Sequence, residues 1–151
     1  MKILIIEDDL NKLQSVKDFL SAFFQRKEFL YDLTIKHSYQ SGLESILNET
    51  FNLLLLDMSL PNFDIDENND SGDPLSKGGE LILYEMDAMG INLKTIIITQ
   101  HEDFDGVSLE SINSDYKDKF PEIYLNYVFY NSIESNWEIE LEQILIGVIS
   151  D

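Results

Sequence analysis

The segment Ile3–Asp9, which reads ILIIEDD, opens the chain with a short apolar run that three acidic residues end abruptly. A continuous apolar run of this length is typical of a strand buried on both faces of a parallel sheet. Leu53–Asp57, which reads LLLLD, repeats the pattern, and Pro61 close behind it favours a strand over a helix. Two buried strands that end in carboxylates predict an α/β protein with acidic chemistry at one edge of its sheet.

Further strands and helices follow from the hydrophobic periodicity on either side of these two segments. Strands are expected at residues 31–36, 95–99 and 123–130, and helices at 11–25, 40–47 and 80–89, with a helical or irregular stretch before Pro121. The last helix opens with the capping-box pattern Ser135-x-x-Glu138. Strands that alternate with helices predict a doubly wound, five-stranded parallel sheet with flanking helices.

Composition limits the classes of protein to consider. A length of 151 residues suits one domain, 1–151, without a separate output domain. The formal net charge of −19 predicts no direct binding to nucleic acid or to a membrane surface. The chain has no cysteine and no apolar run long enough for a membrane span or a secretion signal, so we expect a cytoplasmic protein.

Polar residues follow three of the predicted strands at the point where each ends. Glu7 and Asp8 end the first strand, Asp57 ends the third, and Thr99 ends the fourth. In open α/β sheets the functional crevice lies beyond the carboxyl ends of the strands. Carboxylates gathered there would repel one another unless a cation neutralised them, and hard oxygen ligands suit Mg²⁺. The competing interpretation is that Asp8 or Asp9 only caps the following helix.

The motifs ILIIEDD, LLLLDMSLP (residues 53–61) and IIIT (residues 96–99) together resemble the receiver domains of two-component response regulators, the CheY-like superfamily with a flavodoxin-like fold. The resemblance covers most of the chain. It implies a phosphoacceptor, Asp57, and a Mg²⁺ site formed by Glu7, Asp8, Asp57 and the backbone carbonyl of Ser59. It also implies a switch made of the Thr99 hydroxyl and an aromatic residue, Tyr127.

The chain departs from the family pattern at the end of the fifth strand. Receivers normally carry a lysine there that pairs with the phosphoryl oxygens, and here Tyr130 occupies that position. No lysine follows Lys119, so we expect positive charge at the site from the metal alone, or from Lys117 or Lys119 folding back. The acidic stretch 62–79 is also longer than the turn usual after the phosphoacceptor, and we interpret it as a loop that screens the pocket or selects a basic partner.

Three functions remain open from the sequence. The first is a phosphoacceptor signalling module, not an enzyme beyond its own phosphorylation and dephosphorylation, that receives phosphate from a histidine kinase or phosphotransfer protein and binds an output protein. The second is a pseudo-receiver, a scaffold for protein interaction that is independent of phosphorylation. The third is a metal-dependent phosphohydrolase with Asp57 as nucleophile, although the second aspartate of the haloacid-dehalogenase type is replaced by Ser59.

Overall fold

A five-stranded parallel sheet forms the centre of the molecule in the computed structural model, which describes residues 1–64, 77–134 and 136–150. The strand order is β2-β1-β3-β4-β7, as expected for a doubly wound sheet. The strands are β1 (Lys2–Ile6), β2 (Asp32–Lys36), β3 (Leu53–Leu56), β4 (Lys94–Thr99) and β7 (Tyr124–Phe129). The predicted fold class is confirmed.

The two strands that carry the acidic tips lie side by side in the interior of the sheet. The register pairs Ile3 with Leu53 and Ile6 with Leu56, and the paired apolar residues of both strands are buried. Their apolar runs are continuous because helices cover both faces of a parallel sheet. The register therefore brings Glu7 and Asp57, the residues that follow Ile6 and Leu56, to the same edge.

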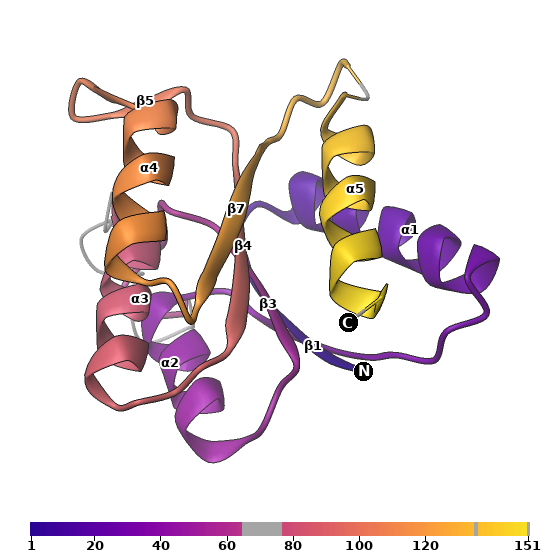
Figure 1. Ribbon diagram of the computed structural model, residues 1–151, viewed down its shortest axis with the longest axis horizontal. Coiled ribbons are helices and arrows are strands. Elements are labelled where there is room, and N and C mark those ends of the chain that lie inside the picture. The colour runs from indigo at the N-terminus through magenta and orange to yellow at the C-terminus, as the bar shows by residue number, and fades with distance from the viewer. Residues whose placement is uncertain (65–76, 135, 151) are drawn as a thin grey trace.

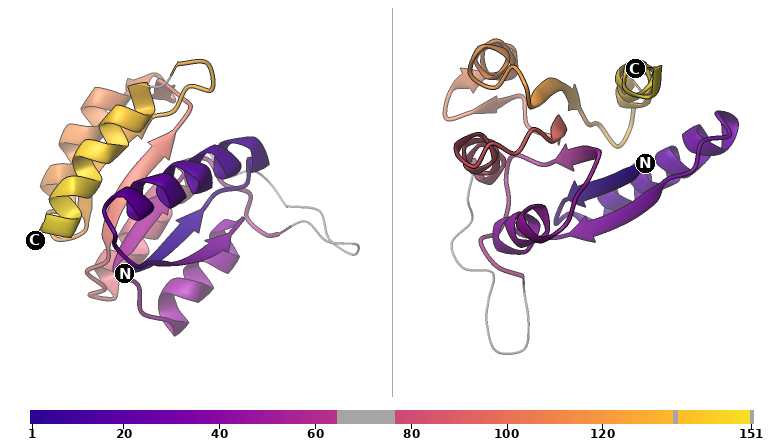
Figure 2. Two further views of the ribbon diagram at one scale, coloured as in Figure 1. Left: turned by 90° about the vertical axis from the view of Figure 1, so that its right-hand side faces the viewer. Right: turned by 60° about the horizontal axis from the view of Figure 1, so that its bottom comes forward.

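Helices cover the sheet in two unequal layers (Figure 1). α1 (Leu10–Arg26) and α5 (Asn136–Ser150) lie on one face, and α2 (Tyr39–Asn48), α3 (Gly78–Ala88) and α4 (Leu109–Lys119) lie on the other. Figure 2 shows α1 and α5 side by side across their face of the sheet. Each layer encloses its own apolar core, one on the α1–α5 side and one on the α2–α3–α4 side.

Local signals set the helix ends as the sequence predicts. The side chain of Asp9 accepts hydrogen bonds from the backbone N–H groups of Asn11 and Lys12, so Asp9 is the N-cap of α1 and Asp8 is free of that role. Gly90 takes a left-handed φ of 69° just beyond α3, and the next N–H, of Ile91, donates to the Met86 carbonyl at 2.9 Å.

The stretch after β4 contains a small hairpin that the hydrophobic pattern did not predict. β5 (Asp103–Phe104) and β6 (Val107–Ser108) pair antiparallel, with Asp105 and Gly106 both at positive φ. An Asp-Gly pair is the preferred sequence of such a two-residue turn. The Ser135 capping box and residues 65–76 of the acidic stretch lie outside the described residues.

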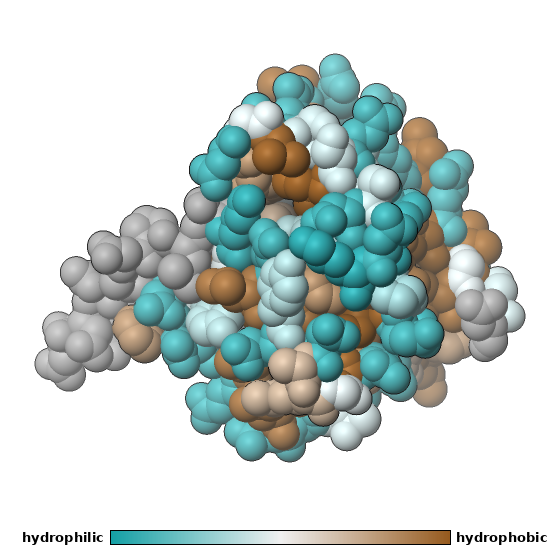
Figure 3. Space-filling model, turned by 60° about the vertical axis from the view of Figure 1, so that its left-hand side comes forward, coloured by the Kyte–Doolittle hydropathy of each residue, from teal (hydrophilic) through white to brown (hydrophobic). Residues whose placement is uncertain are grey.

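Hydrophilic side chains cover much of the face that Figure 3 presents, with hydrophobic side chains between them and toward one edge. None of the described helices is long and apolar enough to cross a membrane.

Candidate functional site

Three carboxylates meet at the carboxyl edge of the sheet. Glu7, Asp8 and Asp57 each place one oxygen so that all three oxygens lie within 4.8 Å of one another. Glu7 and Asp57 are buried, and Asp8 is exposed at the rim. The predicted convergence of the first and third strand tips is therefore confirmed.

Glu7 is held rigidly by its surroundings. Its Oε2 accepts hydrogen bonds from the backbone N–H groups of Asp8 and Asp9, each at 3.1 Å. Its own backbone carbonyl accepts a bond from His37 Nδ1 at 2.9 Å. Burial raises the pKa of Glu7 to about 7, because the positive charge of Lys12 offsets the loss of solvent only in part and the charge of Asp57 adds to it.

Asp57 is buried at the tip of β3, almost as deeply as Glu7 at the tip of β1. It is 7% exposed, and its backbone N–H donates to the Ile6 carbonyl at 3.1 Å. Burial raises the pKa of Asp57, as it raises the pKa of Asp8, where the Glu7 charge contributes as well. Within the described part of the chain, Asp57 Oδ1 is buried without a hydrogen bond. A buried oxygen left in that condition has the capacity to bind a ligand.

The cation of the site is Lys12, which the sequence analysis missed. Its Nζ lies 2.5 Å from Glu7 Oε1 and 3.3 Å from Asp57 Oδ1, the latter an ion pair without hydrogen-bond geometry. It also donates to the Ile98 carbonyl at 2.6 Å. The expectation that positive charge could come only from a metal or from Lys117 or Lys119 is thus wrong, because helix α1 delivers a lysine to the strand tips.

A signal for Lys12 was present in the sequence. The buried face of α1 includes Val16, Leu20 and Phe24, and a step of four residues back from Val16 reaches Lys12. This register places Lys12 on the face of α1 that packs against the sheet, although it does not say which strand residues the lysine meets. A helical pattern defined by apolar residues alone leaves Lys12 out of the buried face.

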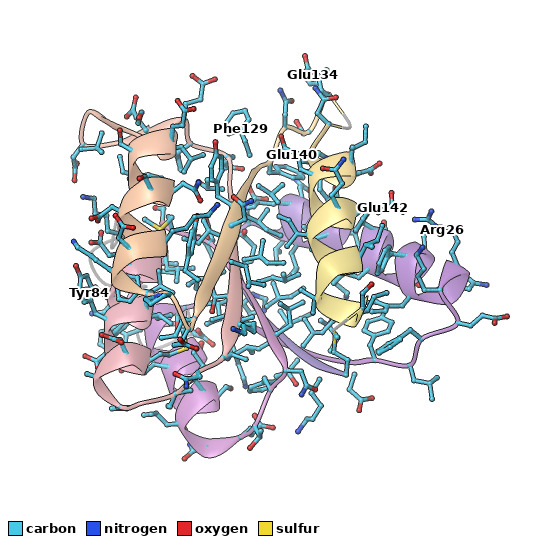
Figure 4. All side chains as sticks on the ribbon, in the orientation of Figure 1. Arg26, Tyr84, Phe129, Glu134, Glu140 and Glu142 are labelled. Atoms are coloured by element: carbon cyan, nitrogen blue, oxygen red, sulfur yellow. The ribbon has the colours of Figure 1, made fainter. Side chains whose placement is uncertain are left out.

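The other two cationic possibilities are located elsewhere. Lys119 Nζ lies 3.1 Å from both the Tyr84 hydroxyl and Asp115 Oδ2. Tyr84 lies on the outer side of α3, in the helical layer opposite to α1 (Figure 4). Lys117 belongs to the same C-terminal turn of α4.

Tyr130 follows β7, where its backbone N–H donates to the Thr99 carbonyl at 2.7 Å. Its side chain is buried among residues of the α1–α5 layer. The hydroxyl donates to Ser15 Oγ at 3.1 Å, and the ring lies against Trp137 with centroids 5.2 Å apart. Tyr130 is therefore a packing residue of the α1–α5 layer, and its assignment to the lysine position of the family stays a prediction.

The two predicted switch residues lie on adjacent strands. Thr99 ends β4 fully buried, and its Oγ1 accepts a hydrogen bond from the His101 N–H at 3.1 Å. Tyr127 pairs with Ile97 and is partly buried against the α2–α3–α4 core. The switch roles of both residues, and the metal-binding role of the Ser59 carbonyl, stay predictions.

A glycine fixes the backbone around Asp57. A Cβ at Gly79 would lie 2.5 Å from the Asp57 carbonyl oxygen and 3.0 Å from Met58 Cα. The Gly79 N–H also donates to the Met58 carbonyl at 2.9 Å. The start of α3 is therefore in direct contact with the backbone of Asp57 and Met58 and helps to fix its position.

A cavity of about 390 Å³ opens beside these residues, at the carboxyl ends of β4 and β7. Its lining includes Lys12, Gln100, Phe129 and Tyr130. Glu7 and Asp57 do not line this cavity; together with Lys12 they line a separate small one of about 10 Å³. Lys12 lines both, so it connects the buried carboxylates with space for a small anionic group.

Comparison with known proteins agrees with this geometry. No family model matches the chain. Over 148 residues, 93% of this chain and 95% of the other, it is 29% identical to the Detocs response regulatory protein DtcB of Enterobacter cloacae.

Solved structures that superpose on the chain include receiver domains. The CheY-like response regulator receiver domain protein of Methanospirillum hungatei superposes with a TM-score of 0.64 at 26% identity, over 99% of this chain and 94% of that one. A second is the receiver domain of the sensor histidine kinase PA1611 of Pseudomonas aeruginosa, which was solved with a magnesium ion coordinated in the active site cleft. It superposes with a TM-score of 0.62 at 18% identity, over 99% of this chain and 98% of that one. In its sheet order and its acidic strand tips, the chain is similar to the CheY-like receiver domains of response regulators.

Proposed function

We propose that the protein is a phosphoacceptor signalling module in which Asp57 accepts a phosphoryl group with Mg²⁺ as cofactor. The observation that carries this proposal is the convergence of Glu7, Asp8 and Asp57 at one edge of the sheet, with Asp57 Oδ1 buried and free of hydrogen bonds among the described residues. A carboxylate held in this way is available as a nucleophile toward an activated phosphoryl group.

The residues present fit a magnesium ion. Mg²⁺ prefers a few carboxylate oxygens together with water and phosphate oxygens, and the site offers three carboxylates that burial and mutual repulsion make costly without a cation. Glu7, Asp8 and Asp57 would hold the ion, with the Ser59 carbonyl as a further ligand. The ion would supply positive charge to the carboxylates and to the transferred phosphoryl oxygens.

Three residues of the chain would carry out the transfer and the switch that follows it. Asp57 would attack the donor, and the Thr99 hydroxyl at the end of β4 would donate a hydrogen bond to a transferred oxygen. Thr99 now accepts from the His101 N–H, so its movement would pull on the loop that follows β4. Tyr127 on the neighbouring strand would respond by moving inward against the α2–α3–α4 core.

The partners follow from this chemistry. A histidine kinase or phosphotransfer protein would supply the phosphoryl group, and an output protein would recognise the surface of α4, β7 and α5. Phosphorylation would therefore regulate the binding of another protein and not the turnover of a free substrate.

Acetyl phosphate with Mg²⁺ tests the proposal directly. We expect one phosphoryl adduct by intact mass in the wild-type protein and none in Asp57→Asn. Asp9→Asn is the matched control, because Asn caps a helix as well as Asp does and Asp9 acts as the cap of α1. Backbone NMR shifts on addition of beryllofluoride should reach Thr99 and Tyr127. A protein with no adduct and no shifts would be the pseudo-receiver scaffold, and steady phosphate release from monoesters would indicate a hydrolase.

A further inference from the structure

We propose that Lys12, from the first turn of α1, takes the place of the missing strand-five lysine and binds the phosphoryl group carried by Asp57. The inference rests on the proposed function and assigns the cationic contact within it. In the unphosphorylated protein the same ammonium group serves as counter-ion to Glu7 and Asp57.

The contacts of Lys12 place its charge where transfer would occur. The side chain is buried, at 2% exposed, and its three nearest acceptors are Glu7 Oε1, the Ile98 carbonyl and Asp57 Oδ1. The first two are at hydrogen-bond distance, whereas Asp57 Oδ1, at 3.3 Å, forms an ion pair without a hydrogen bond. The ammonium charge therefore lies beside the reactive carboxylate without being bound to it by a hydrogen bond.

The position is a poor one for a lysine that serves stability alone. The other buried residues of α1 are all apolar, and Lys12 is the exception among them. Burying an ammonium group carries a large desolvation cost, and a positive charge at a helix N-terminus opposes the helix dipole. An apolar residue here would avoid that cost but would leave Glu7 and Asp57 buried without a counter-ion. The lysine is therefore tied to the acids of the site, unlike the apolar residues on the rest of the buried face of α1.

The expected lysine position cannot supply the contact, because Tyr130 is bound to the α1–α5 layer through Ser15 and Trp137. Lys12 and Tyr130 nevertheless line the same cavity at the ends of β4 and β7. The cation thus reaches the site from helix α1 on one side of the cavity and not from strand β7 on the other.

The transfer step balances with no further reactant. A carboxylate oxygen of Asp57 forms a bond to the phosphorus of an acyl phosphate or phosphohistidine donor, and the bond from phosphorus to the donor breaks. Acetate or the histidine imidazole leaves with the bonding electrons. The Lys12 ammonium neutralises charge on the phosphoryl oxygens throughout and keeps its proton.

The first test compares Lys12→Met with Lys17→Met, a partly exposed lysine of the same helix. We expect Lys12→Met to slow adduct formation from acetyl phosphate by roughly 100-fold, and Lys17→Met to leave it unchanged. The affinity for Mg²⁺, measured by calorimetry, should change in the opposite direction. We expect Lys12→Met to bind Mg²⁺ more tightly than the wild-type protein, on the order of tenfold, because a competing cation has been removed. A purely structural role would weaken both.

Restoring the charge by two routes completes the test. Lys12→Met combined with Tyr130→Lys should recover adduct formation in part, since a lysine then reaches the cavity from β7. The chain has no cysteine, so Lys12→Cys can be aminoethylated at that one residue in denaturant and refolded. The aminoethyl product, a lysine analogue, should regain the rate, and the carbamidomethyl product should not. This pair remains decisive even if Lys12→Met fails to fold.

The outcomes separate this inference from the proposed function. Unchanged adduct formation in Lys12→Met, with loss in Asp57→Asn, would overturn the role of Lys12 and leave the phosphoacceptor intact. Equal rates for the aminoethyl and carbamidomethyl products would do the same. Absence of any adduct in the wild-type protein would instead remove the proposed function itself.

Discussion

At the scale of single residues, the site is a balance of buried charges. Glu7 and Asp57 lose solvent at the strand tips, and Lys12 compensates for that loss only in part, since the pKa of each acid stays raised. Buried charges that are incompletely neutralised are typical of functional sites, where stability is given up for reactivity. The incomplete balance has measurable consequences in the metal-free protein.

The raised pKa of Glu7 predicts how stability depends on pH. Glu7 binds its proton more tightly in the folded state, with a pKa of about 7 against 4.5 for the ordinary group. The stabilisation from that proton is complete below pH 4.5 and is lost as the pH rises through about 7, an effect on the order of 3 kcal/mol. In EDTA we expect a higher Tm at pH 5.5 than at pH 8. Glu7→Gln should flatten the profile, and a profile equally steep in that variant would contradict the assignment.

Tyr130 gives a second prediction at this scale. Tyr130→Phe removes the hydrogen bond to Ser15 Oγ and should lower the free energy of unfolding by about 1 kcal/mol. Urea denaturation followed by the fluorescence of Trp137, the one tryptophan, measures this change. Adduct formation on Asp57 should stay at the wild-type rate. A loss of phosphorylation would mean that the Tyr130 hydroxyl takes part in the chemistry.

At the scale of elements, the starts of two helices assemble the site. α1 begins at its Asp9 cap and carries Lys12 over the strand tips, while α3 begins against the backbone of Asp57 and Met58. At its other end α1 is joined to α5 by the ion pair of Arg26 with Glu142, 3.3 Å apart (Figure 4). Arg26 is exposed and Glu142 is partly exposed, so this pair contributes little to stability.

The close approach of α3 makes Gly79 the sensitive glycine. In Gly79→Ala the new Cβ would meet backbone atoms of the Asp57 loop, so the loop must shift, at a cost of roughly 1–3 kcal/mol. We expect a lower Tm and slower phosphorylation. Gly147→Ala in α5 is the matched control, because nothing lies within 4 Å of its Cβ position and alanine stabilises a helix interior by about 1 kcal/mol. Equal effects of the two changes would refute the contact.

The elements also show where sequence patterns succeed. The strands and helices with continuous or periodic apolar residues were predicted to within a few residues, because their burial repeats along the chain. The β5–β6 hairpin was missed because its strands are only two residues long and show no period, although Asp105-Gly106 is a turn signal in itself.

At the scale of the whole molecule, net charge opposes compactness. With a formal charge of −19, the folded chain repels itself, and screening should relieve that repulsion. We expect the Tm in EDTA to rise between about 10 mM and 300 mM NaCl. Tetramethylammonium chloride at equal ionic strength should act similarly if the effect is screening. A Tm that responds to sodium alone would indicate specific cation binding.

Magnesium should add to this general effect through its specific site. A ligand that binds only the folded state stabilises it by about 2.7 kcal/mol at 100 times its Kd. At constant ionic strength we therefore expect Mg²⁺ to raise the Tm of the wild-type protein at pH 8. The increase should be reduced in Glu7→Gln, which removes one carboxylate of the cluster. An identical increase in both proteins would place the ion elsewhere on the acidic surface.

The sequence by itself determined the parallel sheet, the order of its elements and the identity of the acids at the strand tips. It could do so because apolar runs and the residues that end them are local features. Only the tertiary structure decided that Lys12 is the cation of the site and that the Tyr130 side chain packs within the α1–α5 layer. Those assignments depend on how a helix lies across strands from distant parts of the chain, so no local pattern of apolar residues encodes them.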